Sequence, residues 1–281
     1  MKSQKQFERT FSFEFFPPRS EEGAIKLADA RDKLATLKPR YFSVTFGAGG
    51  STQKGTLETV LDIRKAGYLA APHISCIGTE KSIILDLLNT YKKNGIKHIV
   101  ALRGDMPSGS HDMGDFHHAS ELIRFIRETT GEHFHIEVAA YPEVHPQSSS
   151  VESDIKFFKE KIDAGANSAI TQFFFNADAY YRFVDDCEKI GVNVPIVPGI
   201  SPITNYTNLP RFADNCGAEI PRWIRKRLVD FGDDRDSIFD FGLDVVTKLC
   251  QDLLDNGAPG LHFYTMNGAK ASMALWKNLN L

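Results

Sequence analysis

The sequence has little cysteine, and none of it forms a CxxC pair. The four cysteines, Cys76, Cys187, Cys216 and Cys250, are scattered over 281 residues. Isolated cysteines of this kind are typical of reduced, mostly buried thiols. The sequence therefore excludes a disulfide-framed secreted module and a cysteine-rich zinc module.

Long apolar runs and a strong charge of either sign are also missing. No apolar run reaches the length of a transmembrane helix, and the first ten residues, MKSQKQFERT, lack the apolar segment of a secretory signal. The 33 basic and 36 acidic side chains leave a formal net charge of −3, which disfavours nucleic acid and anionic membranes as partners. We therefore expect a cytoplasmic protein that binds neither nucleic acid nor membrane.

Three familiar ligand motifs are incomplete or absent. The run GAGGST at 47–52 lacks the GK[ST] ending of a phosphate loop, and no GxGxxG follows a predicted strand. The run HDMGDFHH at 111–118 is rich in possible ligands, but its spacing matches no standard zinc or facial-triad pattern. We predict no P-loop, no Rossmann-type dinucleotide site and no metal site.

What the sequence does contain is one theme repeated five times. The segments KAGYLAAPHIS, KNGIKHIVALRG, DAGANSAITQFFF, KIGVNVPIVPGI and DNGAPGLHFYTMN each place a glycine a few residues before an apolar run; these are Gly67, Gly95, Gly165, Gly191 and Gly257. Glycine readily adopts the left-handed conformation that ends a helix. The theme is therefore helix, glycine stop, short loop and buried strand.

Together with three further apolar runs, the theme predicts eight strands, at 11–16, 41–46, 70–75, 98–104, 135–142, 168–175, 194–200 and 260–267. Alternating strands and helices predict a parallel sheet, and strands that are apolar throughout are expected when both faces are covered. Eight such units favour a closed α/β (β/α)8 TIM barrel over an open doubly wound sheet. We predict a single domain over 10–281, extra helices between the last two strands, and a flexible tail over 1–9.

Polar or titratable residues stand at the carboxyl ends of most predicted strands, where the active site of such a barrel forms. They are Glu14, Thr45, His73, Arg103, Gly104, Asp105, Tyr141, His145, Gln172, Tyr264, Thr265 and Asn267. Each alone has a structural explanation: Glu14 could pair with Arg19, His73 could be a hydrogen-bonded core histidine, and Gln172 could satisfy a backbone group. Because all of these residues are expected at the same end of the barrel, together they favour a functional site.

These motifs, in this order, resemble the bacterial methylenetetrahydrofolate reductases. The resemblance rests on FEFFPP at 13–18, SVTFGAGG at 43–50, APHISC at 71–76, HIVALRGD at 98–105, AAYPEVHP at 139–146, AITQFFF at 169–175, PGISPI at 198–203 and HFYTMN at 262–267. It covers essentially the whole chain. It implies non-covalent FAD at the C-terminal face of the barrel, reduced by NADH or NADPH and reoxidised by methylenetetrahydrofolate, in a homotetramer.

The resemblance also implies roles for individual residues. The residues expected to contact FAD are Thr45, His73, Arg103, Gly104, Asp105, Ala119, Tyr141, His145, Asp154 and Lys161. Those expected to contact the folate are Glu14, Asp105, Gln172, Asn208, Phe212 and Lys270, with Glu14 and Asp105 catalytic. The chain departs from the family pattern at Gly268 in place of an arginine, which Lys270 could replace, at Asn208 in place of a glutamine, and at His118 in place of a tyrosine.

Glu14 raises a chemical question because it stands among four phenylalanines in FSFEFFPPRS. Apolar packing penalises the charged form of a carboxyl and raises its pKa, as a general acid acting near neutral pH requires. We therefore expect Glu14 to be neutral and to protonate the folate, while Asp105 stays ionised beside Arg103 and stabilises positive charge on the substrate.

Three other functions remain open on the residues alone. They are a flavin barrel of the proline dehydrogenase kind, a folate-binding barrel that transfers a group without redox chemistry, and a ligand-binding barrel without catalysis.

Overall fold

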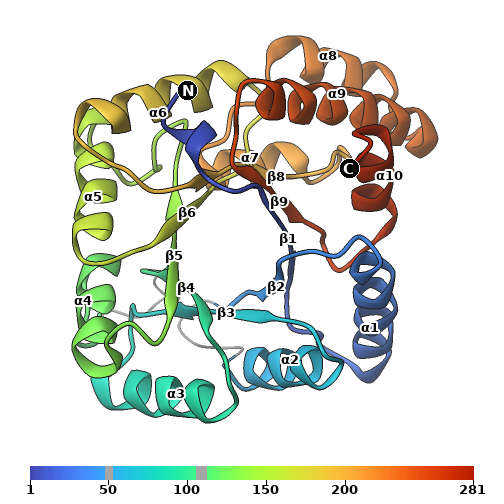
Figure 1. The fold of residues 1–281 in the computed structure, drawn as a ribbon. Helices are drawn as coiled ribbons and strands as arrows, with labels where there is room; N and C mark the ends of the chain where they lie inside the picture. Colours follow the sequence, from blue (N-terminus) through green and yellow to red (C-terminus); the bar gives the residue numbers. More distant parts are fainter. Residues whose placement is uncertain (48–52, 106–112) are drawn as a thin grey trace.

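The computed structural model describes residues 1–47, 53–105 and 113–281, which form a ring of parallel strands with helices around the outside (Figure 1). The strands are β1 (Thr10–Phe15), β2 (Tyr41–Val44), β3 (Ala70–Ser75), β4 (His98–Leu102), β5 (His135–Ala140), β6 (Ser168–Thr171), β7 (Ile196–Val197), β8 (Gly199–Ile200) and β9 (Gly260–Tyr264). Most of GAGGST and the start of HDMGDFHH lie outside the described residues.

The described helices follow the predicted alternation. They are η1 (Gln4–Gln6), α1 (Glu21–Ala35), α2 (Gln53–Lys65), α3 (Lys81–Lys93), α4 (Ala119–Thr130), α5 (Val151–Asp163), α6 (Ala177–Lys189), α7 (Leu209–Cys216), α8 (Arg222–Asp230), α9 (Arg235–Asp255) and α10 (Lys270–Asn278). The helices α7 and α8 are the extra segments expected between the last two strands. The five glycines of the repeated theme all have positive φ, between 69° and 111°, as a helix stop requires.

The ring closes through a seventh barrel strand that Pro198 divides in two. The sheet order is β7-β6-β5-β4-β3-β2-β1-β9-β8. Because β7 pairs with β6 and β8 pairs with β9, the single segment 196–200 joins both edges. Proline has no N–H to donate to a ladder, which explains the break. The predicted closed TIM barrel is confirmed, and the open doubly wound sheet is excluded.

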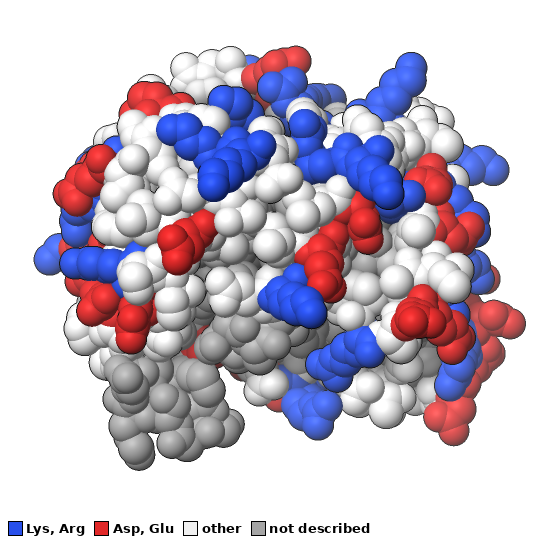
Figure 2. All heavy atoms as spheres, turned by 90° about the horizontal axis from the view of Figure 1, so that it is seen from below, with Lys and Arg blue, Asp and Glu red and all other residues white. Residues whose placement is uncertain are grey.

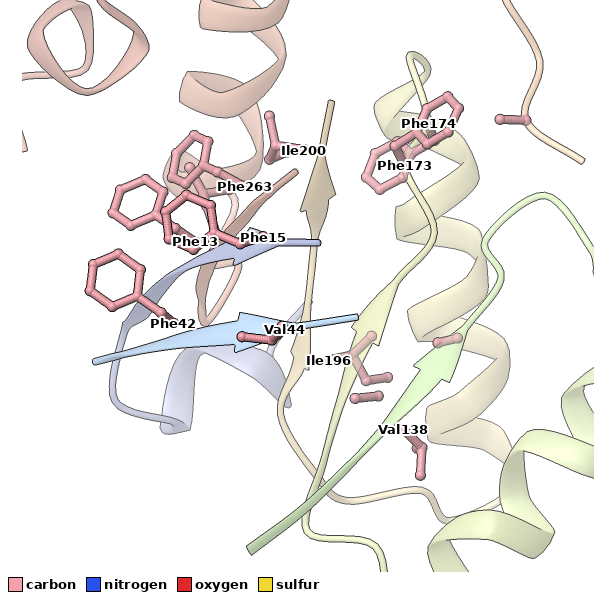
Figure 3. Close-up of a cluster of buried hydrophobic side chains, with 14 of the residues drawn as sticks. Phe13, Phe15, Phe42, Val44, Val138, Phe173, Phe174, Ile196, Ile200 and Phe263 are labelled. Atoms are coloured by element: carbon pink, nitrogen blue, oxygen red, sulfur yellow. The ribbon is translucent and has the colours of Figure 1, made fainter. Parts of the chain in front are cut away.

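Alternation along β1 sends its side chains to two different environments. Phe13 and Phe15 are fully buried on the outer face of the sheet with Phe42 and Phe263, as Figure 3 shows. The Phe13 ring lies 6.0 Å from that of Trp276 in α10. Ser12 and Glu14 point to the inside of the ring, where they contact His262 and His73 on other strands. The phenylalanines therefore pack between the sheet and the outer helices, and the carboxyl of Glu14 lies inside the barrel.

Residues 1–9 do not form the free tail that we expected. Gln4 is buried; its amide donates to the carbonyl of Val194 at 3.2 Å and accepts from the backbone N–H of Ile196 at 2.8 Å. Arg9 donates to the carbonyl of Leu254 at 2.9 Å. The polar composition of the segment suggested a solvated tail, but its amide side chain satisfies backbone groups at the start of β7.

We predict that Gln4→Ala lowers the free energy of unfolding by about 1–3 kcal/mol, because it leaves the buried N–H of Ile196 without a partner. Gln6→Ala is the matched control: its side chain is exposed and bonds only to Asn193, so we expect a change below about 0.5 kcal/mol. Denaturant midpoints measure both. Equal midpoints for the two variants would show that the segment is not held as described.

Candidate active site

Glu14 lies between two histidines inside the C-terminal half of the barrel. Its Oε2 is 3.4 Å from Nε2 of His262 and 3.3 Å from Nε2 of His73. The other ring nitrogen of His262 lies 2.7 Å from Oγ of Ser12. This contact holds the orientation of the imidazole ring. His73 approaches without the alignment of a hydrogen bond, and its Nε2 is buried with no hydrogen-bond partner in the described chain. The site is a carboxylate held by two imidazoles.

This arrangement overturns the expectation that Glu14 is neutral. Burial by itself raises the pKa of Glu14, but the hydrogen bond with His262 and the charge of His73 outweigh it and bring the pKa down to about 2. The phenylalanines cannot oppose this effect because they occupy the opposite face of β1. The alternation of side chains along a strand could have revealed this in the sequence. It places Glu14 on the face opposite the phenylalanines, and it also turns His262 and Tyr264 of β9 inward.

A second carboxyl inside the barrel, Glu137 of β5, is held ionised in a similar way. Burial raises its pKa, but the charge of His98, whose Nε2 lies 3.3 Å from Oε1 of Glu137, and the hydrogen bond from Tyr41 bring it to about 2. Folded-state pKa values below the ordinary 4.5 mean that Glu14 and Glu137 stabilise the fold above about pH 4.5. That contribution is lost as the pH falls from about 4.5 toward 2.

We therefore predict that the thermal midpoint falls as the pH is lowered through this window. The pH dependence should be shallower in Glu14→Gln, because one of the two depressed carboxyls is gone. Calorimetry from pH 6 down to the acid transition measures both slopes. Parallel slopes for the two proteins would contradict the ionised state of Glu14.

A cavity of about 430 Å³ opens where β4 and β5 end, between the start of α4 and one side of α5. It brings together eight of the ten residues expected at FAD: Arg103, Gly104, Asp105, Ala119, Tyr141, His145, Asp154 and Lys161. The other two, Thr45 and His73, lie outside its lining, and His73 points at Glu14 instead. Residues between 103 and 161 in the sequence thus meet in one cavity, because the barrel places the ends of β4 and β5 next to α4 and α5.

Lys161 is a half-buried cation that lines this cavity. Its Nζ donates to the carbonyl of Ala139 at 2.5 Å, and no carboxylate of the described chain lies within ion-pairing distance of it. Burial lowers the pKa of Lys161 to about 8, although the charge of Asp154 opposes the shift. A partly buried ammonium without a paired anion is costly, so this position favours an anionic ligand.

Two aromatic rings form one wall of the cavity: His118, which we noted as a departure from the family pattern beside the flavin adenine, and Phe157, which we did not assign to the site. His118 stacks on Phe157 with ring centroids 5.7 Å apart and planes at 17°, and Phe157 is 45% exposed. An exposed aromatic pair in a cavity offers a flat surface on which a planar ring can stack. The pair combines the residue before α4 with one in α5, so no local pattern revealed it.

Asp105 and Arg103 both line the cavity, but they do not form the expected pair. Arg103 donates to the side chain of Gln147 and to the carbonyl of Gly104. Among the described residues no ion pair joins Arg103 to Asp105, which is exposed. Gly104 between them has φ +79°, and a Cβ there would lie 1.6 Å from Oγ of Ser75, so the close turn requires glycine.

The residues expected at the folate are only partly brought together. The ring of Phe212 stacks on Phe173 with centroids 5.2 Å apart and planes at 11°, which places α7 beside the end of β6. Gln172 precedes Phe173, and its Oε1 accepts from the N–H of Phe173 at 3.0 Å, the structural role that we had left open. Asn208 is exposed, and Lys270 lies over the ring of Phe239, 4.5 Å from its centre; neither lines the cavity.

Glu14 and Gln172 nevertheless lie on the same rim of the barrel. Tyr264 pairs in register with Glu14, and its hydroxyl donates to the carbonyl of Thr171 at 2.7 Å. Thr171 directly precedes Gln172. The carboxyl ends of β1, β9 and β6 therefore meet at one level, as the barrel interpretation required.

Basic and acidic side chains are interspersed over the face drawn in Figure 2. Within the described ranges, none of the helices combines the length and apolar character needed to cross a membrane.

Comparison with known proteins identifies the family. The family model described as methylenetetrahydrofolate reductase matches residues 1–280. The 5,10-methylenetetrahydrofolate reductase of Escherichia coli is 40% identical over 96% of this chain and 90% of its own length. The methylenetetrahydrofolate reductase (NADH) 1 of Arabidopsis thaliana is 37% identical over 99% of this chain, which spans about half (49%) of that protein.

A solved structure supports the fold. It is that of an uncharacterized Clostridium thermocellum protein that binds two copies of 5-methyl-5,6,7,8-tetrahydrofolic acid; it superposes with a TM-score of 0.71 at 15% identity and covers 100% of this chain and 98% of its own. With the fold, the site geometry and the matches to sequence relatives in agreement, this chain belongs to the methylenetetrahydrofolate reductase family.

Proposed function

We propose that this protein uses FAD to reduce 5,10-methylenetetrahydrofolate to 5-methyltetrahydrofolate with NADH or NADPH as the electron donor, in a ping-pong sequence that supplies methyl groups for methionine synthesis. Family membership supports the reaction. The single observation that carries the cofactor is the cavity of about 430 Å³, in which the half-buried Lys161 has no ion-pair partner among the described residues. The family resemblance adds a homotetramer, which analytical ultracentrifugation would test.

The donor set of this cavity fits the diphosphate and adenine of FAD. Lys161 and Arg103 offer cationic donors for phosphate oxygens. Ala119 is the first residue of α4, whose N-terminal dipole favours anions, and the carboxylate of Glu121 already accepts from the N–H groups of His117 and His118 at this helix end. The stacked His118 and Phe157 offer a surface for the adenine. FAD, when bound, supplies hydride transfer between the nicotinamide and the folate.

The folate is expected to bind over the rim where Glu14, Gln172 and Phe212 lie. The Phe173–Phe212 stack offers an apolar surface for an aromatic ring of either substrate. The amide of Gln172 must turn away from the N–H of Phe173 if it is to contact a pterin. Lys270 at the start of α10 is the expected contact for the carboxylates of the folate tail.

Glu14 delivers the proton that the folate requires at a ring nitrogen when its methylene bridge opens. Because Glu14 is ionised between His73 and His262, we place that proton in the three-group cluster rather than on Glu14 alone. In this proposal the carboxylate first takes a proton from one protonated imidazole and then passes it to the substrate nitrogen, which leaves that imidazole neutral. Asp105, at the cavity rim, is expected to stabilise the developing positive charge.

The test is reconstitution of the purified protein with FAD, followed by stopped-flow measurement of each half-reaction. We expect a yellow protein that is bleached by NADH or NADPH and recoloured by methylenetetrahydrofolate. Recolouring by proline-type substrates alone would favour a flavin barrel of the proline dehydrogenase kind. A colourless protein that cannot be loaded with FAD would favour one of the two folate- or ligand-binding functions without redox chemistry.

A further inference from the structure

The opposite, N-terminal mouth of the barrel contains a second cavity, of about 290 Å³. Its polar lining includes His98 on β4, His135 and Glu137 on β5, and Ser168 on β6. This mouth lies at the other end of the strands from Glu14. In TIM barrels the N-terminal face serves stability rather than catalysis, so these titratable groups need a separate explanation.

The backbone brings two imidazoles and one carboxylate to a common point. His98 and His135 are register partners on neighbouring parallel strands. Glu137 is two residues beyond His135 and therefore lies on the same face of β5. One nitrogen of each imidazole and one oxygen of Glu137 all lie within 4.8 Å of one another.

The spacing suits a small tetrahedral ion. Ligands at the usual zinc distance of about 2.0–2.1 Å stand about 3.3 Å apart along the edge of a tetrahedron. Nε2 of His98 and Oε1 of Glu137 are 3.3 Å apart. His135 is exposed, and its Nε2 lies 2.7 Å from Oγ of Ser168, so an ion bound by that nitrogen would replace this contact.

The hydrogen bonds around the cluster hold Glu137 but leave His98 unsatisfied. Glu137 accepts from the hydroxyl of Tyr41 at 2.5 Å and from Oγ of Ser168 at 3.1 Å. Ser168 also contacts Nε2 of His135 at 2.7 Å. Nε2 of His98 is buried with no hydrogen-bond partner in the described chain, although it faces Glu137. Buried polar atoms are rarely left unpaired, and an ion between His98 and Glu137 would satisfy this one.

We propose that His98, His135 and Glu137 form a binding site for a divalent transition-metal ion, with zinc as the best match, at the N-terminal mouth of the barrel. Two imidazoles favour zinc over magnesium or calcium, which prefer all-oxygen ligands. Water or an anion from the cavity completes the four ligands; the basic rim of Arg40, Arg64 and Lys97 favours an anion or hydroxide. The ion would tie β4 to β5 at the end opposite the reaction.

The test is a calorimetric titration of zinc chloride into the full-length, FAD-loaded protein after treatment with a chelator. We expect one zinc ion per chain and a higher thermal midpoint in its presence. His98→Gln and His135→Gln should each weaken zinc binding at least about tenfold, since the loss of even an outer partner of a ligand costs ten- to a hundredfold. Both variants should retain FAD.

The matched control is His133→Gln. His133 is near the cluster in sequence but bonds to the carbonyl of Ile96 and to Lys97, so its loss should leave zinc binding unchanged. Zinc-edge anomalous diffraction from the unaltered protein locates the ion even if a variant fails to fold. No zinc bound, equal binding in all variants, or an anomalous peak elsewhere, such as at His117 and His118, would overturn the proposal.

Discussion

Glu14→Gln is expected to slow the folate half-reaction at least about a hundredfold, the usual scale of general acid catalysis. The variant keeps the shape of the side chain and the burial of Phe13 and Phe15 on the other face of β1. It removes the carboxylate oxygen that lies near both His73 and His262. Flavin reduction by NADH or NADPH should change little, because that step takes no proton from Glu14. Stopped-flow absorbance measures the two steps separately.

Glu143→Gln is the control for this prediction. Glu143 follows the carboxyl end of β5, and burial raises its pKa to about 6. It therefore titrates closer to neutral pH than Glu14 does. However, its carboxylate accepts from the N–H of Glu219 and faces a different cavity, between α5 and α6. We expect both half-reactions to be retained. Equal slowing of both half-reactions in Glu14→Gln, or a selective folate defect in Glu143→Gln, would refute the role assigned to Glu14.

Lys161→Met is expected to weaken FAD binding about ten- to a hundredfold, while the apoprotein stays at least as stable. A hydrogen bond from a charged donor contributes about 1.5–3 kcal/mol, and each 1.4 kcal/mol is a factor of ten in affinity. The apoprotein should not suffer, because methionine fills the buried volume and removes an ammonium that has no paired anion among the described residues. FAD titration by flavin fluorescence and thermal unfolding of the apoprotein measure the two effects.

Lys159→Met is the matched control on the same helix. Lys159 forms an i,i+4 ion pair with Asp163 at 2.6 Å on the surface of α5 and lies outside the cavity lining. Loss of such a pair costs about 0.3–0.5 kcal/mol, and FAD affinity should not change. If both variants lost FAD equally, the effect would be one of overall charge. If Lys161→Met destabilised the apoprotein strongly, the lysine would be structural rather than a ligand for phosphate.

The barrel itself was readable in the sequence because its signals are local. Each of the five glycine stops lies within a few residues of the helix it ends and the strand it precedes, and all five adopt positive φ. Apolar runs of strand length separated by helical patterns leave few arrangements other than a parallel ring. The break at Pro198 was less obvious, because whether a missing N–H divides a strand depends on which neighbours it would have paired with.

The sequence by itself determined the fold and the rim on which the polar residues gather, because alternation and glycine stops act over a few residues. The family resemblance supplied the ten residues expected at FAD, of which eight line one cavity. Only the tertiary structure decided the charge of Glu14, the partners of Arg103 and Gln172, and the packing of Gln4 against β7. Each of these depends on groups far away in the chain: His73 and His262 lie 59 and 248 residues from Glu14. A pKa is set by the charges and hydrogen bonds around a group in space, and these exist only once the ring has closed.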